Sequence, residues 1–315
     1  MQPEVIVGID VSGAQLDYAV GEDGKPCHVA NSPRGIASLV KRMRVLAPRL
    51  IVIEATGGLE RAAHVALHAA GLQVAKVNAR HVRYLAKAVG QMAKTDRIDA
   101  RMLAKYGRVA SPRVSVPRTE RESELAALVA RDRQLGEEVT REKLRLKRAQ
   151  PGVVREDIAD ALTQLKTRRR AIRKLITKVI DAEPAWREAA THLVSAPGVG
   201  LLTAATLLAY LPELNKESPK SISMLAGVAP INKDSGTHQG VRRIWGGRMI
   251  VRRVLFMAVI TMIRRGKWLA VRYQAMVAAG KKKKVAIVAC MRKLLICLGV
   301  LLKQRRAWRD EQTAL

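Results

Sequence analysis

Short apolar runs alternate with longer amphipathic segments over the first third of the chain. Apolar runs of this length predict strands, and they fall at residues 4–10, 16–21, 28–31, 50–54 and 72–78. Segments with helical spacing lie between and after them, at residues 33–46, 58–70, 80–89 and 98–108. Because strands interleave with helices, we expect an α/β domain over residues 1–112.

The hydrophobic spacing becomes heptad-like between residues 119 and 183. Two stripes share this spacing: Leu125, Leu128, Leu135, Val139 and Leu146 in the first, and Ile158, Leu162, Leu165, Ile172, Ile176 and Val179 in the second. The Pro-Gly pair at residues 151–152 is a strong turn signal between them. The pattern therefore predicts an antiparallel helical hairpin or coiled coil within residues 113–185, with arms about 40 Å long. The hairpin could serve dimerisation or spacing between domains, or it could be a plain helical linker packed on its own chain. The hydrophobic pattern does not decide between these alternatives.

The remaining segment, residues 186–315, is mainly helical by pattern and strongly basic. Residues 193–211 read as a helix, a Pro-Gly-Val-Gly turn and a second helix, which is a helix-hairpin-helix-like pattern. The turn contains Gly198 and Gly200, whose backbone N–H groups could bind a phosphate at the start of the second helix. The alternative is a tight turn between packed helices. Apolar helices are also predicted at residues 251–263 and 285–302, after a polar stretch at 232–248.

The net charge of the chain indicates a polyanionic partner. The sequence has 57 Lys and Arg against 27 Asp and Glu, a formal net charge of +30. A compact chain with this charge repels itself unless a polyanion neutralises it, and nucleic acid is the commonest such partner. Four consecutive lysines, Lys281, Lys282, Lys283 and Lys284, are candidate phosphate contacts. A basic soluble protein, an anionic lipid surface or a solvated lysine loop are the alternatives.

Nothing in the sequence predicts a membrane segment or an oxidising compartment. The longest apolar runs, residues 254–263 and 294–302, are shorter than the roughly 18–20 residues of a spanning helix. The N-terminus has no secretory signal pattern. The three cysteines form no CxxC pair, which favours reduced thiols. We therefore expect a cytoplasmic protein without a membrane partner.

Four acidic residues in the N-terminal third are candidate catalytic and metal-binding residues. Asp10 and Glu54 each end an apolar strand, whereas Asp96 and Asp99 lie three residues apart, on one face of a helix. Carboxylates gathered together repel one another unless a cation compensates them, and hard oxygen ligands suit Mg²⁺ or Mn²⁺. Taken singly, each acid is explained by a turn or a helix cap. The four together in so basic a chain favour phosphodiester chemistry.

A second candidate lies in the polar stretch near the C-terminus. Ser235, in an Asp-Ser-Gly turn, is a candidate nucleophile, although such turns are common without catalysis. Arginines suited to phosphate follow it: Arg242, Arg243, Arg248, Arg252 and Arg253. Their alternative is a solvated or salt-bridged helix face.

The sequence resembles the IS-one-ten family of bacterial insertion-sequence transposases. The segments GIDVSGAQLDYAV, IVIEATGGLERAAHVALHAAGLQVAKVN and AKTDRIDARMLAKY are similar to its RuvC-like DEDD domain. The segments SAPGVGLLTAATLLAYLPEL, LAGVAPINKDSGTHQG and GGRMIVRRVLFMAV are similar to its C-terminal transposase domain. The likeness covers nearly the whole chain in the family's order, and the helical middle is its least specific part.

The resemblance implies a function in detail. It places the family's acidic tetrad on Asp10, Glu54, Asp96 and Asp99, in an RNase H-like domain that binds Mg²⁺, and its catalytic serine on Ser235. It also implies a covalent phosphoserine link to DNA, and a homo-oligomer, a dimer or tetramer, in which protomers share sites. A structured guide RNA would pair with donor and target DNA. Two alternatives remain: a Holliday-junction resolvase-like nuclease that uses metal-activated water, and a non-catalytic nucleic-acid-binding protein.

Overall fold

The computed structural model describes residues 5–91, 96–232, 234–235, 240–266 and 268–309, with the backbone alone at residues 96–98. The chain divides into two compact units, residues 1–118 and 119–315. The hydrophobic pattern of the sequence predicts three segments instead, residues 1–112, 113–185 and 186–315. The difference arises because the helical hairpin shares a hydrophobic core with the C-terminal helices. A division into three functional domains stays a prediction.

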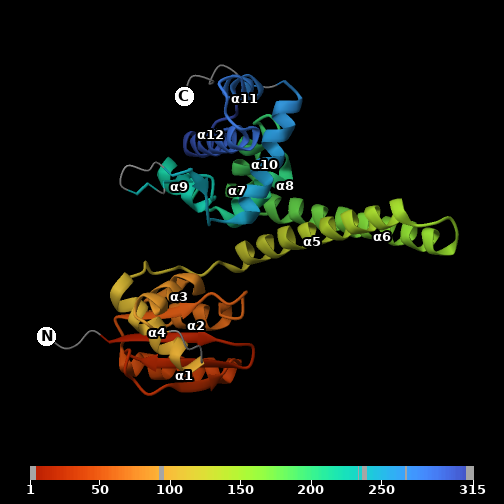
Figure 1. The fold of residues 1–315 in the computed structure, drawn as a ribbon. Coiled ribbons are helices and arrows are strands. Elements are labelled where there is room, and N and C mark those ends of the chain that lie inside the picture. Colours follow the sequence, from red (N-terminus) through yellow and green to blue (C-terminus); the bar gives the residue numbers. More distant parts are fainter. Residues whose placement is uncertain (1–4, 92–95, 233, 236–239, 267, 310–315) are drawn as a thin grey trace. The chain divides into compact units, whose positions relative to one another are not determined.

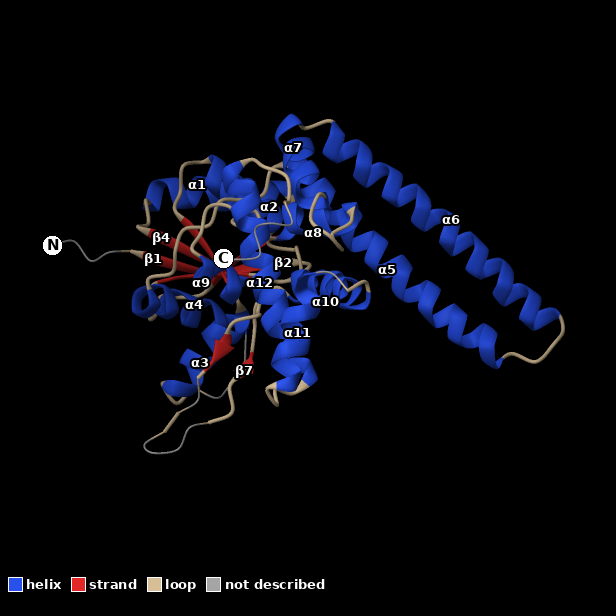
Figure 2. Cartoon of the chain, turned by 90° about the horizontal axis from the view of Figure 1, so that it is seen from above, coloured by secondary structure: helices blue, strands red, loops and turns tan. Residues whose placement is uncertain are grey.

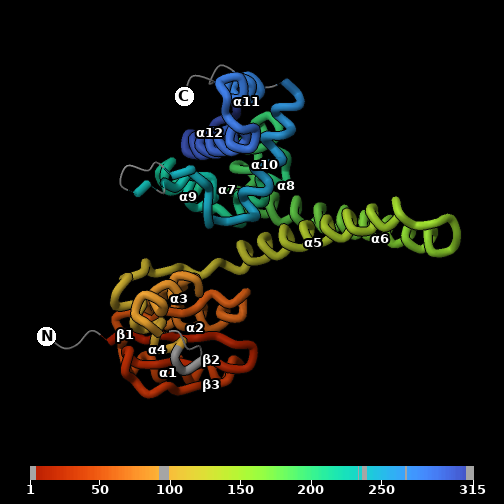
Figure 3. Tube along the Cα trace, in the orientation of Figure 1, coloured from red at the N-terminus to blue at the C-terminus, as the bar shows by residue number. Residues whose placement is uncertain are grey.

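The N-terminal unit is built on a five-stranded mixed sheet with the order β3-β2-β1-β4-β5. The strands are β1 (Ile6–Val11), β2 (Gln15–Val20), β3 (Cys27–Ala30), β4 (Leu50–Glu54) and β5 (Val74–Val77). The first three, labelled in Figure 3, pair antiparallel as a meander. β1, β4 and β5 pair parallel. This sheet and its helices agree with the α/β prediction.

Two pairs of helices cover the two faces of this sheet. On one face, α1 (Pro33–Leu46) and α2 (Arg61–Ala69) pack on Val7, Ile9 and their neighbours. On the other, α3 (Ala79–Ala88) and α4 (Asp96–Ala110) pack on Ile6 and Val52. The alternation of strand side chains produces these two cores.

Glycines let α4 lie very close to the sheet. A Cβ added at Gly8 of β1 would overlap the carbonyl oxygen of Ala100 on α4. A Cβ at Gly107 would come within 2.7 Å of Val52 on β4. Because no side chain intervenes, the α4 backbone sits directly over the ends of β1 and β4.

The C-terminal unit begins with two long helices that run side by side (Figures 1 and 2). They are α5 (Glu120–Arg148) and α6 (Val153–Asp181), separated by the Pro151–Gly152 turn. Thr119 and Glu122 form a reciprocal capping box at the start of α5. At 1.5 Å per residue, each 29-residue arm is about 44 Å long.

The rest of this unit is a compact set of helices. They are α7 (Pro184–Val194), α8 (Leu201–Tyr210), α9 (Pro219–Leu225), α10 (Met249–Arg264), α11 (Trp268–Ala278) and α12 (Lys283–Gln304). A two-stranded ribbon is formed by β6 (Pro230–Ile231), just before the polar stretch at 232–248, and β7 (Arg243–Ile244), within it; no element was predicted at either place.

Within the described part of the chain, α12 alone is long and apolar enough to cross a membrane. Its Leu294, Leu295 and Leu298 are fully buried in the unit's core, as in the core helix of a soluble protein. Cys290 lies in the same core, and burial raises the pKa of its thiol. Cys290 is therefore a packing residue of this core.

Candidate active site

The ends of β1 and β4 bring two of the predicted acids to the same level. The two strands pair in parallel, with Ile9 opposite Ile53, so Asp10 and Glu54 follow in register. Residues in register on neighbouring strands project from the same face of a sheet. Asp10 alternates with Gly8, so this face is the one that α4 covers.

Asp10, Glu54 and Asp99 line one pocket of about 200 Å³ in the N-terminal unit. Asp99 comes from the first turn of α4, the helix that the glycine contact holds against β1. All three side chains are half-buried, and Asp10 accepts a 2.9 Å hydrogen bond from the Val11 backbone N–H. The fold thus brings together acids that are up to 89 residues apart in the chain.

The fourth predicted acid, Asp96, begins α4, but its side chain lies outside what the structure describes. The donor set of the pocket is made of carboxylate oxygens, which are ligands for hard cations such as Mg²⁺. Among the side chains that are described, no three His, Cys, Asp or Glu stand close enough to hold a metal ion together. Metal binding at these acids therefore stays a prediction.

Other residues of the same pocket escaped the sequence analysis. Ser12 and Thr56 line it just beyond the ends of β1 and β4, and Arg83 lines it from α3. A buried carboxylate, Glu60, shapes the loop after β4 by accepting the backbone N–H groups of Thr56 and Gly58. The predicted topology could have indicated Ser12 and Thr56, because the segments that follow neighbouring parallel strands lie at the same edge of a sheet.

Ser235 lies in the C-terminal unit, in the connection between β6 and β7, and its side chain is exposed. Its neighbour Asp234 accepts a 3.1 Å hydrogen bond from the Gly240 backbone N–H, which closes this part of the loop. Residue 233 and residues 236–239, with His238, lie outside the described part. A nucleophilic role for Ser235 stays a prediction.

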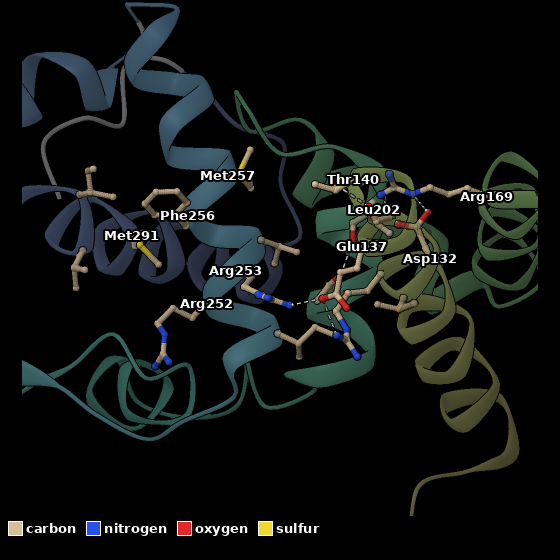
Figure 4. A pocket seen from close by; sticks show the side chains of 18 of the residues that line it. Asp132, Glu137, Thr140, Arg169, Leu202, Arg252, Arg253, Phe256, Met257 and Met291 are labelled. Carbon is tan, nitrogen blue, oxygen red and sulfur yellow. Dashed lines mark hydrogen bonds and ion pairs between the residues drawn. The ribbon is translucent and has the colours of Figure 1, made fainter. Parts of the chain in front are cut away.

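Three of the predicted phosphate-binding arginines make contacts inside the C-terminal unit. Arg248 forms a bidentate ion pair with Glu213, with Nη2 2.6 Å from Oε1. Arg253 contacts Glu137 of the hairpin at 2.9 Å (Figure 4). Arg252 donates to two backbone carbonyls, those of Gly227 and Gly246.

The other predicted contacts in this unit are placed differently. Arg242, Arg243 and the lysines at residues 281–284 are all exposed. Gly198 has a φ of +75°, and a Cβ there would approach Ala258 of α10 within 2.8 Å of its carbonyl oxygen. Gly198 is thus required for packing, whereas Gly200 is exposed at the start of α8. No phosphate contact of any of these residues is tested by the structure.

A large groove of about 1230 Å³ lies between the base of the hairpin and helices α8, α10 and α12 (Figure 4). Its walls are mostly apolar, and Phe256 and Met257 are 42% and 60% exposed. Charged residues at the hairpin side are paired, including Asp132 with Arg169. Figure 4 shows Asp132 and Arg169 at one end of the groove and Phe256 and Met291 toward the other.

Comparison with known proteins assigns the chain to a family. Residues 7–154 match a model described as a DEDD transposase, and residues 190–274 match one described as transposase, IS116/IS110/IS902 family. The first match contains all four predicted acids and the second contains Ser235. The chain is also 29% identical to the pilin gene-inverting proteins of Moraxella lacunata and Moraxella bovis, over 95% of this chain and 96% of each relative.

The two family matches follow one another in the chain in the order that the sequence resemblance predicts. Together with the relatives, which align along nearly the full length, they confirm that resemblance. The chain belongs to the IS-one-ten family of insertion-sequence transposases and is a DNA transposase or recombinase.

Proposed function

We propose that this protein cuts and rejoins DNA through a metal-bound carboxylate site and a serine nucleophile. The observation that carries the proposal is the pocket in which Asp10, Glu54 and Asp99 converge from β1, β4 and α4. A fold that gathers three carboxylates beside the ends of parallel strands, in a chain of charge +30, is suited to a phosphodiester substrate. The N-terminal unit is then an RNase H-like, RuvC-like catalytic domain.

Asp10, Glu54, Asp96 and Asp99 would hold Mg²⁺ or Mn²⁺. Such an ion supplies Lewis-acid polarisation of a phosphate oxygen when it is bound. The carboxylates themselves position the ion, and their mutual repulsion makes the pocket a strong attractor for a divalent cation. The half-buried setting of the three described acids strengthens this attraction relative to bulk water.

Ser235 would be the nucleophile. Its Oγ forms a bond to phosphorus while the bond from phosphorus to the leaving sugar oxygen breaks, and the hydroxyl proton passes to that oxygen. The reverse reaction, with a sugar hydroxyl of another strand as the attacking group, rejoins the DNA and releases the serine. The covalent link conserves the energy of the broken phosphodiester, so rejoining needs no external energy source.

The serine and the acids belong to different units of the chain. The proposal therefore requires both units to act on one phosphodiester, contributed by one chain or by different protomers of a dimer or tetramer. Sequence choice would be delegated to a structured guide RNA that pairs with donor and target DNA, as the family resemblance implies. Aromatic residues make up only 3% of the chain, which suits recognition of the backbone rather than base stacking. Such a protein would act on the nucleoid.

The test uses a labelled plasmid that carries the gene with its native flanking DNA, incubated with the protein and Mg²⁺ and then denatured. The wild type should give a protein–DNA adduct, and Ser235→Ala should give none. Asp10→Asn should abolish cleavage while DNA binding is retained. Ser38→Ala, an exposed serine on α1, is the matched control and should behave as the wild type.

The outcomes separate the alternatives. Free cut ends made equally well by Ser235→Ala would replace the serine nucleophile by metal-activated water, as in a resolvase-like nuclease. Cleavage at the wild-type rate by Asp10→Asn would refute the role of the acidic pocket altogether.

A further inference from the structure

Helix α3 carries a basic face at the rim of the acidic pocket. Arg80, Arg83, Tyr84 and Lys87 are spaced i, i+3, i+4 and i+7, so they lie on one side of the helix. All four side chains are exposed, and Tyr84 is 54% exposed. The opposite side packs into the core through Val82.

The charged side chains of this face have no ion-pair partner among the residues that the structure describes. None of the four side chains has an ion pair or side-chain hydrogen bond with the described residues. The surrounding sequence offers no compensation, because no Asp or Glu occurs between Glu60 and Asp96. By contrast, Arg248, Arg252 and Arg253, at and just after the N-cap of α10, are engaged with Glu213, backbone carbonyls and Glu137, respectively. An uncompensated basic face of this kind is the electrostatic footprint of a polyanion.

The basic face of α3 lies next to the acidic pocket. Arg83 lines the same pocket as Asp10, Glu54 and Asp99, and Ala79, at the start of α3, lines it too. The side chain of Asn78 caps this end of the helix by accepting the Arg80 N–H at 2.9 Å. Val82 and Ala86 line the pocket as well, so α3 runs along the pocket from its first residue to its last turn.

We propose that this α3 face holds the DNA strand that is cut, next to the phosphate that enters the acidic pocket. The inference rests on the proposed function of that pocket. Arg83 is a positioning residue, because its guanidinium offsets the repulsion between the carboxylates and the approaching phosphate. From Arg80 to Lys87 the helix rises roughly 10 Å, so the three basic side chains follow one another along the strand rather than meeting a single phosphate. Tyr84, between the basic side chains, stacks on a base of the same strand.

The first measurement is the salt dependence of binding by the full-length protein to a short fluorescein-labelled DNA strand of mixed sequence. The triple variant Arg80→Ala, Arg83→Ala, Lys87→Ala should lower the slope of log affinity against log salt by about 2, because each lost contact to a single strand removes about 0.7. The matched control is Arg34→Ala, Lys41→Ala, Arg44→Ala on α1. It removes two arginines and one lysine, all exposed, from the opposite face of the sheet and should leave the slope unchanged.

The second measurement is cleavage as a function of DNA concentration. Arg83→Ala should raise KM with kcat largely retained, whereas Arg83→Lys should recover part of the loss, because it keeps the charge. Tyr84→Ala should weaken strand binding roughly 10-fold, and Tyr84→Phe should restore it, because the stacking ring remains. Melting curves of each variant show that the fold is intact.

An unchanged slope in the α3 variant, or an equal fall in the α1 control, would overturn the proposal. It is also overturned if the α3 variant loses affinity for RNA and keeps its affinity for the DNA strand. A failure of the proposed function would give a different result, because Asp10→Asn would then cut DNA at the wild-type rate. The slope of log affinity against log salt would still show whether α3 binds the strand.

Discussion

Removing the carboxylate of Asp132 should destabilise the C-terminal unit. Asp132 sits on α5 in the interface with α6 and is only 1% exposed. It accepts hydrogen bonds from Arg169 Nε and Nη2, both at 3.0 Å, and from Arg173 Nε at 2.8 Å. Asp132→Ala would leave two guanidinium groups without their partner beside an apolar interface.

The magnitude follows from how far the arginines can reach water. Breaking a fully buried ion pair costs about 3–5 kcal/mol. The side chains of Arg169 and Arg173 are 29% and 50% exposed, so solvent compensates part of the loss. We expect a loss of about 2–3 kcal/mol in the free energy of unfolding. For a unit of this size that corresponds to a fall in Tm of roughly 4–12 °C.

The assay is thermal melting followed by circular dichroism, with Glu137→Gln as the control. Glu137 also bridges two arginines, Arg133 and Arg253, but it is exposed, so its loss should change Tm much less. A Tm for Asp132→Ala within about 1 °C of wild type, which is under 1 kcal/mol, would refute the reasoning.

The same carboxylate should make stability depend on acid. Burial by itself raises the pKa of Asp132, but the hydrogen bonds from Arg169 and Arg173 outweigh it, and the net pKa is below the ordinary value of 3.8. Because the pKa is lower in the folded state, the ionised carboxylate stabilises the fold fully above the ordinary value. This stability is lost as the pH falls through the folded-state pKa. Asp132→Ala should lose this part of the acid dependence.

Three further predictions concern the site, the charge and the N-terminal unit. Gly8→Ala should push α4 away from β1, lower stability by about 1–3 kcal/mol and reduce cleavage more than DNA binding, measured by melting and cleavage assays. Affinity for duplex DNA should fall roughly 10³–10⁵-fold between 50 and 200 mM salt if 6–10 phosphates are contacted, and a flat titration would contradict this. Burial lowers the pKa of His64 from 6.5, so stability should decline as pH falls below 6.5, and His64→Gln should flatten that decline in melting curves.

Local signals in the sequence predicted the elements of the N-terminal unit closely. The predicted helix at 33–46 and strand at 50–54 have the same bounds as α1 and β4. Periodicity works here because each strand is a short apolar run between turn residues, and each helix has one apolar face. Of the four predicted acids, the three whose side chains are described share a pocket, since two of them end neighbouring parallel strands.

Local periodicity could not predict ion pairs between residues that are far apart in the chain. Asp132 falls within a heptad stripe, where an apolar residue is expected, and its partners lie 37 and 41 residues further along the chain. Arg253 pairs with Glu137 at a separation of 116 residues. The short ribbon of β6 and β7 was also missed, because two-residue strands have no periodicity to detect.

These pairings bear on how a net charge of +30 should be interpreted. A count of basic residues treats every arginine as available to nucleic acid, yet Arg248, Arg252 and Arg253 make contacts that fix α10 to its neighbours. If Arg248 bound a phosphate in place of Glu213, the Glu213 carboxylate would be left unpaired next to an anion. The cost of that unpaired charge opposes phosphate binding by Arg248. The basic groups whose charge acts outward are those without an ion pair inside the fold. The α3 side chains make no ion pair with the described residues, so the α3 face is a stronger phosphate site than these arginines, and its position beside the acidic pocket gives it a role in cutting as well as in binding.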